Sequence, residues 1–377
     1  MPSSPADVAV VGAGVIGASC AFHLAKLGAR VTVIERGPQP GVGSTGKATG
    51  GFRAQFESEI DVRLSLLARD KLRVFSEELG VDPGYRSCGY LWLARSEAEL
   101  EKLRAANVVQ RSAGLHEASI VSTSQAARLS PHVSHAGVVG AAWCPTDGFI
   151  RPMEILRGYV EGARRLGVEF RFGESVAALG EGEVRTTGGN VRCGLVVNAA
   201  GAWAAEVAAL AGIDLPVSPL RRQVACTVPT SLLPEEAPMT IWVSDGFHLR
   251  VRDGRVLLLL PEPEAPRFDT PVDEAWVSRV VAAARERVPL LRDLPIERSW
   301  AGLYEMSPDA RVILGPVTPQ LFLVNGSSGH GAMHSPALGQ LAAEWIVHGA
   351  PRALDCAPLS LQRFSAGGNQ AKAKALL

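Results

Sequence analysis

The fold is decided near the start of the chain, where residues 7–35 read DVAVVGAGVIGASCAFHLAKLGARVTVIE. Residues 7–11 form a short apolar run rich in β-branched side chains, glycines follow, and residues 18–27 combine helix-forming residues with an apolar face. Gly28 is suited to end that helix, and residues 30–34 form a second apolar run that leads to Glu35. The pattern predicts a strand, a glycine turn, a helix and a second strand, which together make a βαβ unit.

The glycine turn, GAGVIG at residues 12–17, has GxGxxG spacing between the strand and the helix. Gly12, Gly14 and Gly17 permit a tight turn and let a pyrophosphate approach the helix start at Val15 and Ile16. These features predict a dinucleotide site, and the alternative is a merely structural glycine turn.

Glu35 ends the second strand, where a carboxylate can accept hydrogen bonds from both adenosine ribose hydroxyls and repels a 2′-phosphate. This placement disfavours NADP. A solvated charge at a strand end is the alternative for Glu35, and the βαβ unit alone does not separate FAD from NAD.

The composition narrows the class of ligand and the setting. A chain of 377 residues is long enough for two intertwined domains with a shared core. The 38 Lys and Arg residues balance the 38 Asp and Glu residues, which removes the electrostatic case for nucleic acid or an anionic membrane and favours a small ligand. We expect no signal peptide, no transmembrane segment and a cytoplasmic location. The six cysteines contain no CxxC pair, which argues against a disulfide framework, a zinc site or an iron–sulfur cluster.

The rest of the chain alternates between strand and helix patterns. Residues 37–51 are rich in Gly, Ser, Thr and Pro and predict a loop. We expect helices over residues 64–78, 96–113, 151–166, 273–287 and 336–348, and strands over residues 89–94, 168–172, 195–198, 223–228, 247–251, 256–260 and 321–324. The strands at 168–172 and 195–198 return the chain to the first domain.

Several of these segments together resemble the D-amino acid oxidase-like (DAO) family of FAD-dependent oxidoreductases. The matching pieces are residues 7–17, VIER at 33–36, GSTGKATGGFR at 43–53, NAAGAW at 198–203, WAGLYEMSPD at 300–309 with ILG at 313–315, and GSSGHG at 326–331. The resemblance covers essentially the full length and points to the branch of sarcosine oxidases, glycine oxidases and dimethylglycine or proline dehydrogenases.

The resemblance implies an α/β fold, in which a Rossmann-type FAD-binding domain is interleaved with a mixed α+β substrate domain built on an antiparallel sheet. The FAD-binding domain is expected at residues 1–85, 146–215 and 305–377, and the substrate domain at 86–145 and 216–304. It also implies noncovalent FAD, because Gly302 stands where monomeric sarcosine oxidases attach flavin through a cysteine.

Further cofactor-binding residues follow from the same resemblance. Hydroxyls and a cation in the 43–53 loop neutralise phosphate, and backbone donors after residue 328 face the flavin pyrimidine ring, where they stabilise the charge of the reduced form. Added to the glycine turn and Glu35, the expected residues are Arg36, Ser44, Thr45, Lys47, Ala48, Thr49, Gly50, Val176, Ala200, Gly201, Trp203, Gly302, Gly329, His330, Gly331 and Met333. A metal site at His330 and His334 is disfavoured, since no carboxylate lies near them in sequence.

The expected reaction is oxidation of a carbon–nitrogen bond in an amino acid or N-substituted glycine. Hydride passes from the α-carbon to flavin N5, and the resulting imine is hydrolysed. Arg53 is expected to bind the substrate carboxylate, while Arg222, His248 and Tyr304 lie in segments that resemble the substrate-facing sheet. A surface or ion-pair role is the alternative for Arg53.

Two departures from the family pattern leave questions open. Met333 replaces a carboxylate-binding lysine, and no residue in 255–261 (RVLLLLP) matches the lysine that activates oxygen. The acceptor is therefore O₂, with Lys47 or Arg222 as the replacement cation, or another acceptor. The apolar run at 256–260 is either a core strand or a hint that the substrate carries a hydrophobic arm.

The alternatives in other classes are an FAD-binding subunit that passes electrons to a partner and an NAD-dependent dehydrogenase. The sequence leaves the oligomeric state open between a monomer, a homo-oligomer and a hetero-oligomer.

Overall fold

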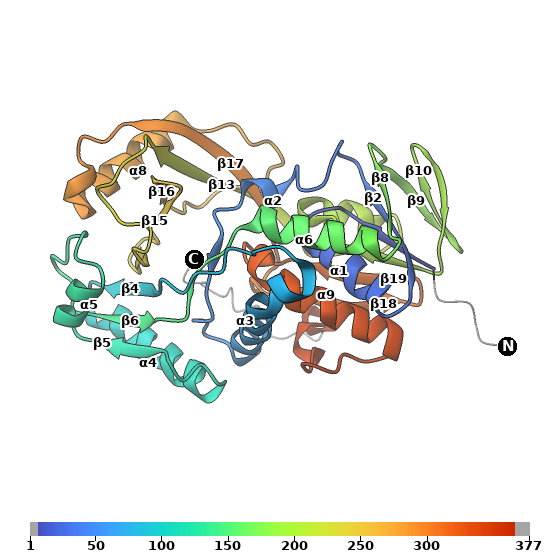
Figure 1. Cartoon of the computed structure of the whole chain (residues 1–377), viewed down its shortest axis with the longest axis horizontal. Coiled ribbons are helices and arrows are strands. Elements are labelled where there is room, and N and C mark those ends of the chain that lie inside the picture. Colours follow the sequence, from blue (N-terminus) through green and yellow to red (C-terminus); the bar gives the residue numbers. More distant parts are fainter. Residues whose placement is uncertain (1–6, 366–377) are drawn as a thin grey trace.

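The computed structural model describes residues 7–365, and its elements form two lobes (Figure 1). The outer limits of the predicted FAD-binding segments, residues 1 and 377, lie outside the described residues, as do residues 1–6, on which the expectation about a signal peptide rests. The predicted βαβ unit is present as β1 (Asp7–Val11), α1 (Val15–Lys26) and β2 (Arg30–Glu35), with β1 and β2 parallel.

The first large sheet has six strands in the order β18-β19-β12-β1-β2-β8. The neighbours from β19 to β8 are parallel, and β18 is antiparallel to β19. The remaining members of this sheet are β8 (Glu169–Phe172), β12 (Leu195–Asn198), β18 (Ile313–Thr318) and β19 (Leu321–Asn325). Strands from four distant parts of the chain thus meet in one sheet, which places their ends around one site.

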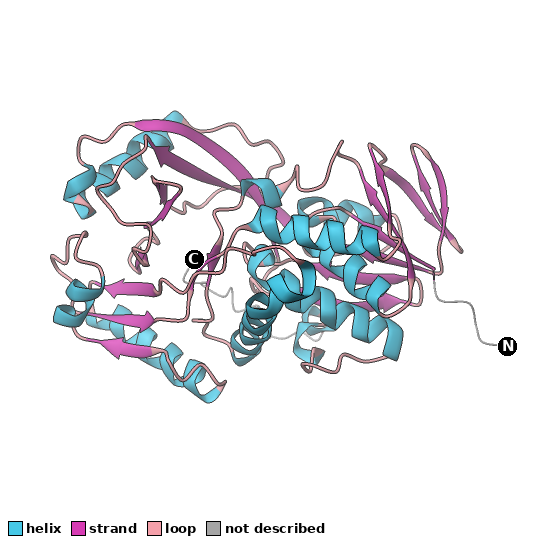
Figure 2. Ribbon diagram, in the orientation of Figure 1, coloured by secondary structure: helices cyan, strands magenta, loops and turns pink. Residues whose placement is uncertain are grey.

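Helices from distant segments pack against this sheet and against each other (Figure 2). They are α1, α3 (Glu59–Leu79), α6 (Pro152–Arg165) and α9 (Gly331–His348), while the short α7 (Ala204–Ala209) follows β12. Their apolar faces are rich in Ala, Leu and Phe and share one buried core with the strands. Burial of these faces holds the glycine turn rigid at the edge of the sheet.

Helix α9 begins at Gly331, five residues before the expected start at Pro336. Proline lacks an N–H, so it leaves the carbonyl of Ala332 without its usual helical donor. The Ser335 hydroxyl donates to that carbonyl at 2.9 Å and so compensates for the missing bond. The helix N-terminus consequently lies at the GSSGHG segment.

The second large sheet has eight strands in the order β17-β13-β16-β15-β14-β4-β6-β5. All neighbours are antiparallel except β14 and β4. Its strands are β4 (Tyr90–Ala94), β5 (Ser119–Val121), β6 (Gly140–Cys144), β13 (Ser218–Thr227), β14 (Met239–Trp242), β15 (His248–Arg252), β16 (Arg255–Leu259) and β17 (Ile296–Met306). Helices α4 (Glu97–Ser112), α5 (Thr123–Leu129) and α8 (Glu274–Arg287) belong to the same lobe.

Several short features were not expected from the sequence, including β5, α5 and β6. Strands β9 (Val176–Gly180), β10 (Glu183–Thr186) and β11 (Gly189–Arg192) form a separate antiparallel sheet. The predicted loop at 37–51 contains one helical turn, α2 (Ser44–Lys47), because Thr45 and Ser44 bond to distant segments and fix the backbone. Strands β3 (Gly51–Phe52) and β7 (Gly148–Phe149) pair where the chain crosses between the lobes.

The remaining elements are the 3₁₀ turns η1 (Gly201–Trp203), η2 (Pro289–Leu291), η3 (Ala357–Leu359) and η4 (Leu361–Phe364). Across residues 7–365, no helix is both long and apolar enough to cross a membrane. Five of the six cysteines are buried, and Cys88 is partly exposed.

Candidate functional site

A cavity of about 710 Å³ is lined by residues from both large sheets. All predicted site residues except Gly17 line this cavity. They are Gly12, Gly14, Val15, Ile16, Glu35, Arg36, Ser44, Thr45, Lys47, Ala48, Thr49, Gly50, Arg53, Val176, Ala200, Gly201, Trp203, Arg222, His248, Gly302, Tyr304, Gly329, His330, Gly331 and Met333. The fold therefore brings the predicted cofactor and substrate residues to one place.

The glycine turn needs bare backbone at two positions. Gly12 has a φ of 104°, and a Cβ there would lie 2.5 Å from the carbonyl oxygen of Ala199. A Cβ on Gly17 would lie 2.0 Å from the Gly12 oxygen, which explains why Gly17 supports the turn without lining the cavity. The turn consequently exposes backbone N–H groups at the start of α1, where an anion is stabilised.

The Glu35 carboxylate is tied to the glycine turn. One oxygen accepts the Ala13 N–H at 2.8 Å and the other accepts the Gly37 N–H at 2.7 Å. Each oxygen has a further lone pair directed elsewhere, so the carboxylate can also accept from a ribose. Beside it, Arg36 stacks on Trp203, with the guanidinium carbon 3.5 Å from the ring centroid. A half-buried carboxylate and a cation–π pair form this end of the cavity.

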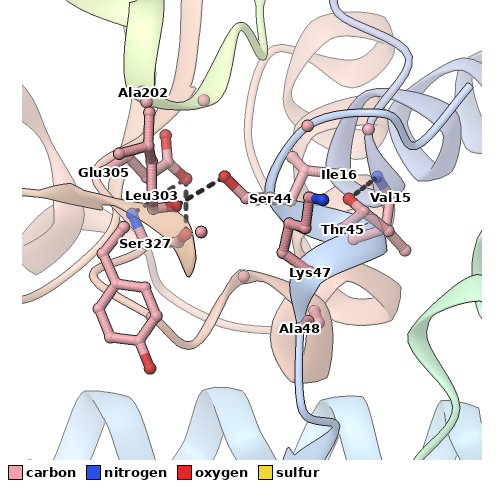
Figure 3. A pocket seen from close by; sticks show the side chains of 18 of the residues that line it. Val15, Ile16, Ser44, Thr45, Lys47, Ala48, Ala202, Leu303, Glu305 and Ser327 are labelled. Carbon is pink, nitrogen blue, oxygen red and sulfur yellow. Dashed lines mark hydrogen bonds between the residues drawn. The ribbon is translucent and has the colours of Figure 1, made fainter. Parts of the chain in front are cut away.

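The loop around α2 connects the two lobes (Figure 3). Thr45 Oγ1 accepts the Val15 N–H at 3.1 Å, and the Ser44 hydroxyl donates to the Leu303 carbonyl at 2.6 Å. Lys47 lies between these two contacts, and a Cβ on Gly302 would come within 2.8 Å of the Lys47 Cβ. The lysine therefore supplies a cation to the middle of the cavity.

The same loop is held from the substrate-facing sheet. Arg250 Nη1 donates to the carbonyls of Thr49 and Gly50 at 2.7 and 2.8 Å, and Arg252 Nη1 donates to Ala48 at 3.2 Å. Three consecutive carbonyls are thus satisfied by the other lobe, which fixes the course of the loop.

Helix α9 directs its N-terminus at the cavity. Residues 327–333 line the cavity, and the first backbone N–H groups of a helix have no partner within it. Their partial positive charge favours an anionic group there. His330 occupies the N-cap position without a side-chain capping bond, and His334 lies in the first turn, where its Nε2 is 2.8 Å from Ser65 Oγ. Burial lowers the pKa of His334 to about 3.

Neither histidine takes part in a metal cluster. No group of three or more His, Cys, Asp and Glu side chains in the described part of the chain is arranged to hold a metal ion.

Arg53 follows β3 and is only 6% exposed. Its Nη1 donates to the Gln55 carbonyl at 2.8 Å, and its Nη2 lies 3.0 Å from His330 Nε2, which accepts because a guanidinium only donates. The Cζ atom lies 4.1 Å from the centroid of the Phe56 ring. Between residues 7 and 365, no carboxylate pairs with Arg53. The site thus holds a buried guanidinium to which no carboxylate of the described residues is hydrogen-bonded, although the charges of Asp147 and Asp61 act to raise its pKa against the larger effect of burial.

Three other predicted substrate residues lie near Arg53. Arg222 Cζ lies 5.8 Å from the centroid of the Tyr304 ring. Burial, with help from the charges of Arg53 and Arg222, lowers the pKa of His248 to about 4, so its imidazole is neutral at physiological pH. His248 Nδ1 lies 2.8 Å from the Gly246 carbonyl and donates to it, which leaves Nε2 as an acceptor. Burial also raises the pKa of the Tyr304 phenol.

Sequence reasoning missed several residues of this chamber. Tyr90, Val224, Met239, Ile241 and Leu259 line it from the eight-stranded sheet. Their strands were largely recognised, but the face that each side chain occupies depends on the register between strands distant in sequence. The run at 256–260 contributes both to a core and to the cavity wall, since Val256 and Leu258 join the core of the second lobe and Leu259 lines the cavity.

Asp147 is a buried residue that the sequence did not single out. Its carboxylate accepts the Ala54 N–H at 2.8 Å and the Gln55 N–H at 3.4 Å, directly after Arg53. Burial raises its pKa to about 7, against the opposing effects of these bonds and of Arg53. An isolated Asp in a turn carries no motif, so only the tertiary structure identifies its role in supporting the 53–55 backbone.

Comparison with known proteins settles the family. Residues 7–345 match the DAO family profile, which describes FAD-dependent oxidoreductases. The chain belongs to this family. It is 31% identical to FAD-dependent oxidoreductase domain-containing protein 1 of Xenopus laevis, over 97% of this chain and 83% of that protein. It is also 30% identical to glycine oxidase of Geobacillus kaustophilus, over 95% and 97% of the two chains.

Solved structures agree. The L-proline dehydrogenase of P. horikoshii matches with a TM-score of 0.90 at 28% identity, covering 97% of this chain and 99% of that one. The predicted family, fold class and FAD cofactor are confirmed, and the NAD-dependent alternative is rejected.

The DAO family chain has a cavity that fits FAD. The N-termini of α1 and α9 supply backbone N–H donors, which suit the pyrophosphate and the negatively charged edge of a reduced flavin ring. A Cβ at Gly12 would clash with the Ala199 carbonyl where the backbone turns toward the cavity. Glu35 stands at the end that suits a ribose, and the cavity volume lies in the usual range for cofactor sites. The chain is thus an FAD-dependent oxidoreductase.

Proposed function

We propose that this enzyme oxidises the carbon–nitrogen bond of an amino acid or N-substituted glycine. Bound FAD would supply the two-electron acceptor for the hydride of the substrate α-carbon. The observation that carries the proposal is Arg53, a buried guanidinium that lines the cavity and has no carboxylate partner among the described residues. The names of the similar glycine oxidase and L-proline dehydrogenase support it.

Arg53 would bind the substrate carboxylate. Its stacking on Phe56 and its donation to Gln55 and His330 hold the guanidinium plane, which leaves its other donors for a carboxylate. Binding through a held plane fixes the orientation of the α-carbon as well as the affinity.

The chamber would favour the neutral, reactive form of the amine. Arg53 and Arg222 place positive charge beside a buried site, and both burial and nearby cations lower the pKa of an ammonium group. Neutral His248 keeps Nε2 free to accept the amine N–H, and the protonated Tyr304 phenol can donate to a carboxylate oxygen. His248 and Tyr304 would thus orient the substrate while remaining uncharged.

We also propose that FAD is held noncovalently and that the two domains follow the boundaries given above. Gly302 stands at the position of the family's linking cysteine, and no cysteine lines the cavity in residues 7–365. Acid precipitation of the purified protein would then release the yellow colour into the supernatant. Colour retained in the pellet would contradict the noncovalent assignment.

The test of the reaction is anaerobic titration of the purified enzyme with glycine, sarcosine, N-alkyl glycines and L-proline, followed by flavin absorbance. We expect bleaching by at least one of these. Methylamine and pyrrolidine, which lack the carboxylate, are the matched controls and should bleach far more slowly. Equal bleaching by the controls would contradict the role of Arg53, and no bleaching by any amine would reject the function.

The electron acceptor is a separate question. We propose O₂, with Lys47 as the cation beside the site, and an FAD-binding subunit that reduces a partner is the alternative. Oxygen uptake measured against reduction of a dye, with wild type and Lys47→Met, distinguishes them. Fast dye reduction without oxygen uptake would favour the partner protein.

A further inference from the structure

Arg222 is a second cation in the substrate chamber. It lies on β13 opposite Gly302 of β17 and lines the cavity beside Tyr304. Within residues 7–365, its side-chain hydrogen bonds run from Nη1 to the backbone carbonyls of Glu262 at 3.0 Å and of Arg221 at 3.4 Å. A guanidinium has five N–H donors, so Nε and Nη2 remain for a ligand.

The neighbouring Arg221 has a structural role, and its charge is neutralised by a carboxylate. Its Nε donates to the Glu264 carboxylate at 2.8 Å, Nη2 contacts the same oxygen, and Nη1 donates to the Pro271 carbonyl. Glu264 thereby forms its hydrogen bonds with Arg221, while its charge also raises the pKa of Arg222 against the larger effect of burial. Arg222, on the opposite face of the strand, receives no carboxylate of its own among the described residues.

Both cations act on the same region. Arg53, Arg222, His248 and Tyr304 all line the cavity, and Arg222 Cζ lies 5.8 Å from the centroid of the Tyr304 ring. The charges of Arg53 and Arg222 both act to lower the pKa of His248 and of Tyr304, which agrees with this arrangement. No Asp or Glu side chain within residues 7–365 is hydrogen-bonded or ion-paired to either guanidinium group, although the charges of Asp147 and Asp61 act to raise the pKa of Arg53 against the larger effect of burial. Four carboxylates line other parts of the cavity, namely Glu35, Glu174, Glu206 and Glu305.

The charge of this chamber exceeds what one carboxylate neutralises. Its walls include Val224, Met239, Ile241 and Leu259, which raise the cost of leaving a cation without an anion. One substrate carboxylate on Arg53 would leave Arg222 unpaired.

We propose that Arg222 binds a second acidic group of the substrate, and that the preferred substrates are amines whose nitrogen lies between two carboxylate-bearing arms. This inference rests on the proposed function, because it assumes that the first carboxylate binds Arg53. Arg53 would hold the carboxylate next to the reacting carbon, and Arg222 would hold the carboxylate of the other arm. The amine then lies beside His248 and Tyr304.

Binding of inert analogues tests the proposal without turnover. Diglycolate replaces the amine by an ether oxygen and carries two carboxylates, its monoamide has the same shape with one charge fewer, and methoxyacetate lacks the second arm. Dissociation constants are measured by calorimetry on the FAD-saturated enzyme. A charge-assisted bond to Arg222 predicts that diglycolate binds at least about tenfold more tightly than the monoamide.

Variants of Arg222 test whether this residue causes the preference for diglycolate over the monoamide. Arg222→Met should reduce the ratio of the two dissociation constants to near one, Arg222→Lys should retain part of it, and Arg221→Gln should keep the wild-type ratio. Equal binding of diglycolate and monoamide by wild type would overturn the proposal even if no variant folds. Flavin bleaching by sarcosine in that case would still uphold the proposed function, whereas absence of bleaching by any amine would reject the function.

Discussion

Two buried groups should give the protein opposing responses to acid. His334 is 3% exposed and has a pKa of about 3, compared with an ordinary value of 6.5. Because only the unfolded chain takes up this proton near pH 6, the stability that His334 contributes is present above pH 6.5 and is lost as the pH falls below it. Between pH 7.5 and 5.5 the loss is about 1.4 kcal/mol.

Asp147 has the opposite sign. It is fully buried, and its pKa is about 7 compared with an ordinary 3.8. Its contribution to stability is complete below pH 3.8 and is lost as the pH rises through 7, so acidification from pH 7.5 to 5.5 restores about 2 kcal/mol. The two titrations partly cancel in the wild type, and single variants separate them.

His334→Gln keeps an amide N–H for Ser65 and removes the titration. We expect this variant to lose about 1.4 kcal/mol less stability than wild type between the two pH values, and Asp147→Asn to lose about 2 kcal/mol more. The assay is urea denaturation of the FAD-saturated protein, followed by tryptophan fluorescence. The exposed His348, replaced by Gln, is the control. Parallel pH dependences in wild type and His334→Gln would refute the reasoning.

Three further predictions concern the cavity. Gly12→Ala should weaken FAD binding at least tenfold in a fluorescence titration, because its Cβ would lie 2.5 Å from the Ala199 oxygen. The control is Gly28→Ala, which also has a positive φ, of 90°, but has open space around the new Cβ and should leave FAD affinity unchanged. Glu35→Gln replaces one acceptor by a donor and should weaken FAD binding about 10- to 100-fold, corresponding to about 1–3 kcal/mol for an unsatisfied group; an unchanged affinity contradicts the assignment. Arg53→Lys should weaken methoxyacetate binding about tenfold or more by calorimetry and leave methoxyacetamide unaffected, and an equal loss for both would point to general disruption.

The sequence predicted those parts of the site that depend on local backbone. Residues 12–17 carry their own strand, turn and helix signals, so their position beside Glu35 followed from the βαβ unit alone. The family motifs extended this to the GSSGHG segment, but the helix start at Gly331 was missed, because Pro336 marks an ordinary helix start and Ser335 compensates for it only in three dimensions.

The chamber walls and Asp147 could not be predicted in the same way. Strands β4, β14 and β16 come from distant segments, and the side chains that face the cavity depend on pairings such as Met239 with Tyr90. Asp147 acts on the N–H groups of residues 54 and 55 across more than ninety positions of sequence. Neither kind of information is present in a local pattern.

Hydrogen bonds between the α2 loop and the other lobe link cofactor binding to the contact between the two lobes. Arg250, Arg252 and Trp300 donate to the carbonyls of residues 47–50, and Ser44 donates to the Leu303 carbonyl. The loop lines the cavity, and it can move only if those donors give up their acceptors. We therefore expect release of FAD to be coupled to separation of the lobes, and a fragment that contains the glycine turn without strands β15 and β17 to bind the dinucleotide weakly.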